Sequence, residues 1–180
     1  MKKFIFITMI ILVGLINCKR VNEALVAEPE WVDLIKNFSF EARGNPSIEG
    51  WKFQSNVLDF PSFSEDTPPE GGDWSVVLSA GDRTYAKLYT VLFPPPGFLI
   101  YQFRFWAKSP QKQGYVRLYH NENLLMVLDV NSSDWLLYQQ SGRLQIVAGD
   151  SIIIEFKTAS TATATKLCID LVKFQFRRKP

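Results

Sequence analysis

Apolar and polar side chains alternate along most of the chain after residue 37. Every second residue from 99 to 107 is apolar, and the positions between them include Gln102, Arg104 and Trp106. A period of two residues places neighbouring side chains on opposite faces of a β-strand. The same alternation predicts further strands at 115–119, 124–128 and 152–157, and additional strand candidates are 75–78, 85–92, 135–140 and 164–176.

Turn-forming residues separate these predicted strands. Proline, glycine, asparagine and aspartate cluster at 68–73, 80–82, 94–97, 121–123 and 149–150. Such clusters end strands because they favour tight turns. Many short strands with regular turns and no long helical pattern predict an all-β fold, an antiparallel β-sandwich or jelly roll.

The last predicted strand changes its alternation at Asp170. Leu167 and Ile169 are apolar before it, whereas Val172 and Phe174 are apolar after it, so the apolar positions change from odd to even. A strand can keep one face buried through such a change only if it contains an extra residue. We therefore predict a β-bulge at Asp170-Leu171 that redirects the aspartate.

The N-terminus has the pattern of an export signal. Lys2 and Lys3 precede an apolar run at 4–16, and about 13 residues are too few to span a bilayer as a helix. The ending Leu15-Ile16-Asn17-Cys18 resembles a bacterial lipobox, which implies cleavage before Cys18 and acylation of its thiol. The alternative is an ordinary exported protein with a structural cysteine. The predicted division is a signal peptide at 1–17, a tether and lead-in at 18–36, a β-sandwich at 37–176 and a basic tail at 177–180.

Charge and cysteine content restrict the partners. Removing residues 1–17 takes away Lys2 and Lys3 and leaves 18 basic residues beside 18 acidic ones, so no large basic field is available for nucleic acid. If Cys18 is acylated, Cys168 is a free buried thiol; if not, the two could form a disulfide. Lys19 after Cys18 favours an outer-membrane lipoprotein of the bacterial cell envelope, periplasmic or surface-exposed. We expect a monomer.

Seven short markers occur in order along residues 37–176 and resemble galactose-binding-domain-like jelly rolls, which include carbohydrate-binding modules attached to xylanases and glucanases. The resemblance implies that fold and, more loosely, glycan binding. The markers are Asn37-Phe38-Ser39-Phe40-Glu41, Gly50-Trp51, residues 70–78, Tyr101 to Lys108, Asp134-Trp135, residues 152–156 and Ile169-Asp170-Leu171-Val172.

The same resemblance implies a structural calcium site. Its ligands would be Glu41, Asp170 and the loop Gly71-Gly72-Asp73, because Ca²⁺ takes six to eight oxygen ligands from carboxylates and carbonyls. Leu171 stands where the family pattern often has a second acid, which removes one ligand. The alternative is that Asp170 only accepts backbone hydrogen bonds at the bulge.

Two predicted strands carry unusual outward-facing residues. If 108–114 joins them as a hairpin, Gln102, Arg104 and Trp106 share one face with Tyr115, Arg117 and Tyr119. One register sets Trp106 opposite Tyr115 and Arg104 opposite Arg117, and a register slipped by two would instead stack Arg117 on Trp106. Aromatic rings stack on sugars and guanidinium groups bind hydroxyls or carboxylates, so this face is a candidate glycan platform. The alternative is that a loop or the N-terminal segment covers it.

These patterns favour a non-catalytic binding module for glycans, with a surface lipoprotein that docks envelope or extracellular proteins as the alternative. A third alternative is a glycoside hydrolase, which needs two facing carboxylates. Asp129, Asp134 and Glu155 are available, but no spacing selects two of them. His120, the only histidine, follows a predicted strand and fits a turn residue better than a catalytic base or metal ligand.

Overall fold

The computed structural model describes residues 30–111, 113–160 and 163–178, and this part of the chain contains strands and turns but no helix. The predicted leader and Cys18 lie outside the described residues. Cys168 is buried and forms no disulfide with a described residue. The described part also holds no helix long and apolar enough to cross a membrane.

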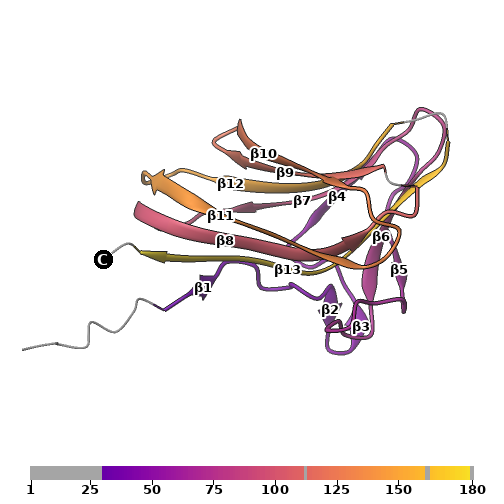
Figure 1. Ribbon diagram of the computed structural model, residues 1–180, viewed down its shortest axis with the longest axis horizontal. Coiled ribbons are helices and arrows are strands. Elements are labelled where there is room, and N and C mark those ends of the chain that lie inside the picture. The colour runs from indigo at the N-terminus through magenta and orange to yellow at the C-terminus, as the bar shows by residue number, and fades with distance from the viewer. Residues whose placement is uncertain (1–29, 112, 161–162, 179–180) are drawn as a thin grey trace, which may run out of the picture.

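Two antiparallel sheets stack to form the sandwich, with β9, β10 and β12 on one side of the core and β8 and β13 on the other (Figure 1). The predicted fold, an antiparallel β-sandwich of the jelly-roll kind, is confirmed. The six-stranded sheet contains, in spatial order, β11 (Leu136–Ile146), β8 (Gly97–Lys108), β13 (Thr165–Arg178), β6 (Ser75–Ala80) and β5 (Ser62–Ser64), with β1 (Val32–Asp33) also paired to β13. The five-stranded sheet contains β10 (Asn123–Val130), β9 (Gly114–His120), β12 (Ile152–Thr158), β7 (Ala86–Leu92) and β4 (Lys52–Ser55), and a small ribbon joins β2 (Glu41–Ala42) to β3 (Asn45–Pro46).

Aromatic side chains from both sheets form the centre of the core. Phe103 and Phe105 on β8 are fully buried and face Phe156 of the opposite sheet, with ring centroids 6.5 Å and 5.2 Å from it. Phe174 on β13 lies 6.2 Å from Phe103. Burying a large apolar side chain contributes roughly 1.5–3 kcal/mol. The alternation that predicted these strands therefore also determines which side chains face outward.

The predicted bulge in β13 is confirmed. Asp170 pairs with Trp106 and Lys173 pairs with Arg104, so two residues of β13 lie opposite one residue of β8. Leu171 takes a left-handed backbone conformation with φ of 49°. Before the bulge β13 pairs with β6, and after it β13 pairs with β1.

The predicted hairpin between β8 and β9 is wrong. β8 pairs with β11 and β13, whereas β9 pairs with β10 and β12 in the other sheet. The connection at 109–113 crosses between the sheets and is held by Ser109, whose hydroxyl donates to Lys166 O at 2.9 Å and accepts from Gln113 N at 3.0 Å. Alternation shows which side chains are buried, but it does not show which strand is the neighbour.

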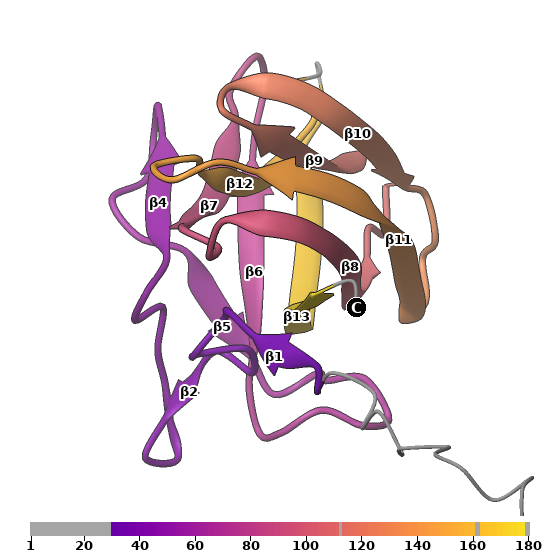
Figure 2. The ribbon, with the colours of Figure 1, turned by 90° about the vertical axis from the view of Figure 1, so that its left-hand side faces the viewer.

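The N-terminal segment lies against the six-stranded sheet. Figure 2 shows β1 beside β13, and Leu34 N donates to Phe174 O at 3.0 Å. Ile35 is only 6% exposed and belongs to the core. Residues 32–35 therefore pack on the sandwich.

Candidate functional site

Polar side chains cover the outer face of the six-stranded sheet over β11, β8 and β13. Phe103, Phe105 and Phe174 point into the core, so the residues between them point outward. The pairing aligns the outward residues in three rows across the strands. We call this surface the polar face; its rows are Gln139–Arg104–Lys173, Ser141–Gln102–Gln175 and Arg143–Ile100–Arg177.

Most side chains of the polar face have no partner within the described structure. Arg104 and Arg143 form no ion pair and no hydrogen bond with any described residue. The same is true of Gln102, Gln139, Ser141 and Gln175, whose side chains donate and accept no hydrogen bond there. Polar groups at a surface that are not used within the protein remain available to water or a ligand.

Arg104 and Lys173 lie directly opposite each other on neighbouring strands. Like charges in this position are unfavourable by some tenths of a kcal/mol to about 1 kcal/mol. Lys173 Nζ lies 4.7 Å from the ring centre of Phe38, and the Arg177 guanidinium lies 5.0 Å from that of Trp31. These rings hold two of the cations in place but do not neutralise them.

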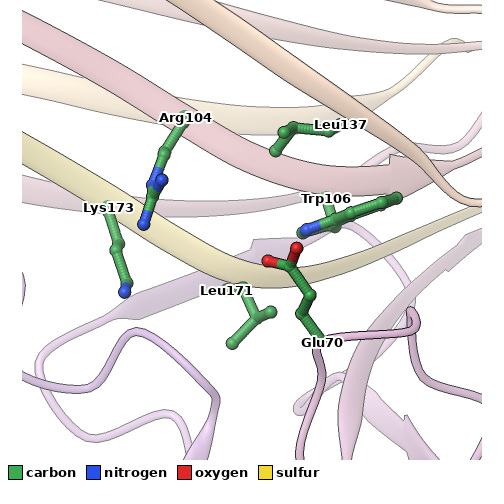
Figure 3. Close-up of a pocket in the computed structure, with 6 residues that line it drawn as sticks. All are labelled: Glu70, Arg104, Trp106, Leu137, Leu171 and Lys173. Atoms are coloured by element: carbon green, nitrogen blue, oxygen red, sulfur yellow. The ribbon is translucent and has the colours of Figure 1, made fainter.

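A small pocket lies at one end of the polar face. Figure 3 shows Arg104 and Lys173 extending in the same direction, while the Glu70 carboxylate reaches toward the Trp106 ring. Leu137 and Leu171 complete the wall, and the volume is about 30 Å³. That volume suits a water molecule rather than a sugar ring. The alternative prediction, that a loop covers this face, applies to Trp106, which lies beside Glu70 of the 65–74 loop. Gln139, Ser141 and Arg143 stay exposed.

Two carboxylates border the polar face. Glu70 lines the pocket, and Asp33 on β1 lies opposite Gln175. Burial raises the pKa of Asp33, although its Oδ1 accepts a hydrogen bond from Ile35 N at 3.0 Å and the charges of Lys173 and Arg104 lower the pKa. The four cations of the face thus outnumber the carboxylates at its border.

The outer face of the five-stranded sheet has a different organisation, and we call it the aromatic face. Arg117 stacks on Tyr115 at 4.7 Å, donates to Tyr119 OH at 3.4 Å and lies 3.6 Å from Glu155 Oε1. The hydrogen bond to Tyr119 is the main cause of a raised pKa for Arg117. Lys87 approaches the same Glu155 carboxylate at 3.5 Å. The charges of Arg117, Lys87 and Glu155 are therefore paired within the protein.

The predicted ligand-binding set is divided between these faces. Arg104 and Trp106 lie on the six-stranded sheet, whereas Tyr115, Arg117 and Tyr119 lie on the five-stranded sheet. The prediction that these residues share one surface is wrong, because their strands belong to opposite layers of the sandwich. The structure brings Arg104 together with Lys173, which the sequence analysis missed.

Glu41 and Asp170, which the resemblance implied as calcium ligands, lie against the same Gly71-Gly72 loop at the bulge. A Cβ at Gly71 would lie 2.7 Å from Asp170 Oδ2, and a Cβ at Gly72 would overlap Glu41 Oε1. Asp170 is fully buried and its Oδ2 has no hydrogen-bond partner among the described residues. The pKa of Asp170 is raised to about 7, chiefly by burial and also by the neighbouring Glu41 carboxylate, whereas the Leu171 N–H that donates to Oδ1 lowers it.

Local hydrogen bonds fix Glu41 in this position. Asn37 Oδ1 accepts from Glu41 N at 3.1 Å, and Trp74 N donates to Glu41 Oε1 at 2.8 Å. Asp73 lies exposed on the same loop, and no group of three acids, histidines or cysteines suited to a metal forms among the described residues. The chemistry of the site still fits Ca²⁺, because two carboxylates converge on a loop of small residues and one buried oxygen lacks a donor.

Comparisons with known proteins show the fold alone. No protein-family model matches the sequence, and no curated protein matches it. Among solved structures, the module TmCBM61 in complex with β-1,4-galactotriose is 18% identical over 82% of this chain and 99% of that chain, with a TM-score of 0.54. The cyclase Fisc from Fischerella sp. TAU is 12% identical over 84% and 100%, with a TM-score of 0.59.

The enzymatically active domain of tailspike protein 4 from bacteriophage CBA120 also matches, at 18% identity and a TM-score of 0.58. The match covers 81% of this chain but only 21% of the tailspike domain, so this chain spans about a fifth of that length. Binding modules and enzymes thus share this sandwich, and its function has to be argued from the site.

Proposed function

We propose that this protein binds carbohydrate without cleaving it, and that the polar face is the binding surface. The observation that carries the proposal is the set of unpartnered side chains around Arg104, which offers donors and acceptors over three strands. Sugar hydroxyls need such paired donors and acceptors. The similarity of the fold to a module crystallised with galactotriose supports the same conclusion.

Arg104 and Trp106 would have different roles in binding. The guanidinium of Arg104 can donate two parallel hydrogen bonds to adjacent ligand oxygens. Trp106, half-buried beside Glu70, would limit the site at that end of the face rather than stack on a sugar. Gln139 lies opposite Arg104 on β11, Gln102 lies two residues before Arg104 on β8, and both supply amide groups that donate and accept.

We also propose a structural calcium ion between Glu41 and Asp170, with backbone carbonyls of the Gly71-Gly72 loop and Asp73 as candidate further ligands. A divalent cation would compensate the two neighbouring carboxylates and the unpartnered Asp170 Oδ2. The ion would stabilise the bulge at which β13 changes partner. It would not contact the ligand.

Export and lipid anchoring remain part of the proposal through Cys18 and the apolar run before it. An acylated Cys18 would hold the sandwich at the cell envelope, most simply at the outer membrane. Globomycin-sensitive processing and incorporation of labelled palmitate would support this. Loss of both in Cys18→Ala is expected, and labelling that persists in Cys18→Ala would contradict it.

We propose that the protein does not hydrolyse glycans, because the surroundings of its carboxylates do not suit an acid–base pair. Glu155 lies between Arg117 and Lys87, and Asp129 is exposed on β10. Neither carboxylate faces a second one as the acid and base of a glycoside hydrolase do.

A protein-docking function is the second candidate, because the edge strand β10 exposes Leu124 by 53%, Leu125 by 42% and Val127 by 47%.

Glycan binding tests the proposal directly. The purified protein is run in affinity gels that contain polysaccharides, including β-1,4-galactan, and is compared with Arg104→Gln and with Lys52→Gln, an exposed cation on β4. Retardation that Arg104→Gln weakens and Lys52→Gln preserves is expected. No retardation by any polysaccharide, together with binding of a purified envelope or matrix protein, would favour docking, and release of reducing ends would establish hydrolysis.

A further inference from the structure

We infer that the ligand of the polar face is an acidic glycan, one that carries carboxylate or sulfate groups along an extended chain. The inference rests on the proposed glycan binding and specifies its ligand class. It starts from the order of the three rows: two rows contain cations and the row between them contains none.

The two cationic rows have a defined separation. Arg104 and Ile100 mark them on β8, and four residues of strand correspond to about 13 Å. Between them, Ser141, Gln102 and Gln175 supply a row of uncharged donors and acceptors. A chain that alternates anionic groups with hydroxyls matches this sequence of rows, whereas a neutral sugar would give Arg104 and Arg143 no anionic partner.

The charge balance of the face points in the same direction. Arg104 and Lys173 lie opposite each other, an arrangement that an anion between them would turn from repulsive to attractive. Asp33 borders β13 and accepts a hydrogen bond from Ile35 N, and Glu70 lies at the pocket beyond Arg104. No outward residue in the three rows is a carboxylate. Arg143 is exposed and carries its charge into solvent at the far side of the face.

Arginine also suits the proposed ligand geometry. Its planar guanidinium binds carboxylate and sulfate oxygens through two parallel hydrogen bonds. Because Gln139, Ser141 and Arg143 are exposed, salt should screen these contacts strongly. The interaction is therefore expected to weaken between low ionic strength and 0.5 M NaCl.

A matched pair of ligands tests the inference. The purified protein is titrated by calorimetry with polygalacturonate and with the same polymer methyl-esterified, which keeps the sugar backbone and removes the carboxylate charges. Dextran sulfate and dextran form a second pair, and vesicles of anionic and neutral phospholipid form a third. The variants are Arg104→Gln, Arg143→Gln and the control Lys52→Gln, each checked by thermal melting.

We expect the acidic member of at least one glycan pair to bind ten times more tightly or better than its neutral partner. Arg104→Gln and Arg143→Gln should each weaken that binding about tenfold, the loss of one charge-assisted hydrogen bond, and Lys52→Gln should not. Preference for polygalacturonate alone identifies carboxylate as the ligand group, and binding of both acidic polymers identifies spaced anions generally.

Other results would overturn the inference. Equal binding of a polymer and its uncharged partner would refute the acidic preference while supporting the proposed glycan binding. Binding of anionic vesicles with no glycan binding would refute both and identify the face as a membrane contact. Binding of none of these probes would also refute both.

Discussion

The two outer faces of the sandwich both carry arginine, lysine and aromatic side chains, yet only the aromatic face pairs its central arginine with a carboxylate. There Glu155 lies within 3.6 Å of Arg117 and 3.5 Å of Lys87. On the polar face Arg104 has no ion pair among the described residues and lies opposite Lys173. Residue types alone would make both faces candidates for binding. The difference lies in whether the folded chain already uses the charged groups.

The largest expected effect on stability lies outside the two faces, at the carboxylates Glu41 and Asp170 beside the bulge of β13. Calcium at one hundred times its dissociation constant should raise the free energy of unfolding by about 2.7 kcal/mol. Gly72→Ala should abolish this response, because the new Cβ would overlap Glu41 Oε1. Gly81→Ala is the control, since its Cβ would lie 3.9 Å from Thr84 Oγ1. The measurement is chemical denaturation with and without calcium, and a wild-type protein that does not respond would refute the calcium site.

The aromatic face should lose stability when its central acid is neutralised. Glu155→Gln leaves Arg117 and Lys87 facing a neutral amide, and we expect the free energy of unfolding to fall by about 1–2 kcal/mol. Asp129→Asn, on exposed β10, should change it by less than about 0.5 kcal/mol. Urea denaturation measures both variants. Equal effects would mean that the network on this face does not stabilise the fold.

A smaller effect is expected at the rim of the five-stranded sheet, where Asp150 accepts hydrogen bonds from Val147 N at 2.8 Å and Asn121 Nδ2 at 2.6 Å and lies 2.9 Å from His120 Nε2. These bonds lower the pKa of Asp150 to about 2, with Val147 N–H the largest cause. A lowered pKa stabilises the fold above the ordinary value of 3.8, and this contribution disappears as pH falls toward 2.

The comparison that isolates this contribution is Asp150→Asn. The melting temperature of the wild type should fall more steeply between pH 4 and pH 2 than that of the variant, because only the wild type has the Asp150 carboxylate to protonate. The other carboxylates titrate in both proteins and cancel in the comparison. Parallel curves would show that Asp150 carries no linked proton.

The sequence predicted the strands and the bulge because both follow from side-chain alternation, which burial enforces. Phe103, Phe105 and Phe174 had to face one core, and the parity change at Asp170 required an extra residue. The placement of β8 and β9 in different sheets could not be predicted in the same way. Alternation is identical whether the next strand is a neighbour or crosses to the other sheet, as the connection at 109–113 does.

The candidate site was predicted in part for the same reason. Arg104 and Trp106 were found as outward residues of one strand, but Lys173, Gln175 and Arg143 were missed. Their signal was present: Lys173 and Gln175 alternate with Phe174 and Phe176, and Arg143 follows the odd-numbered outward positions of β11. What the sequence lacked was the register that aligns these residues with Arg104.

One paired experiment tests the central claim that the polar face binds and the aromatic face stabilises. Arg104→Gln and Arg117→Gln are each measured for polysaccharide affinity and for urea denaturation. We predict that Arg104→Gln weakens binding about tenfold with stability within about 0.5 kcal/mol of wild type, whereas Arg117→Gln lowers stability by about 1 kcal/mol and retains binding. Loss of binding in Arg117→Gln with none in Arg104→Gln would contradict the account.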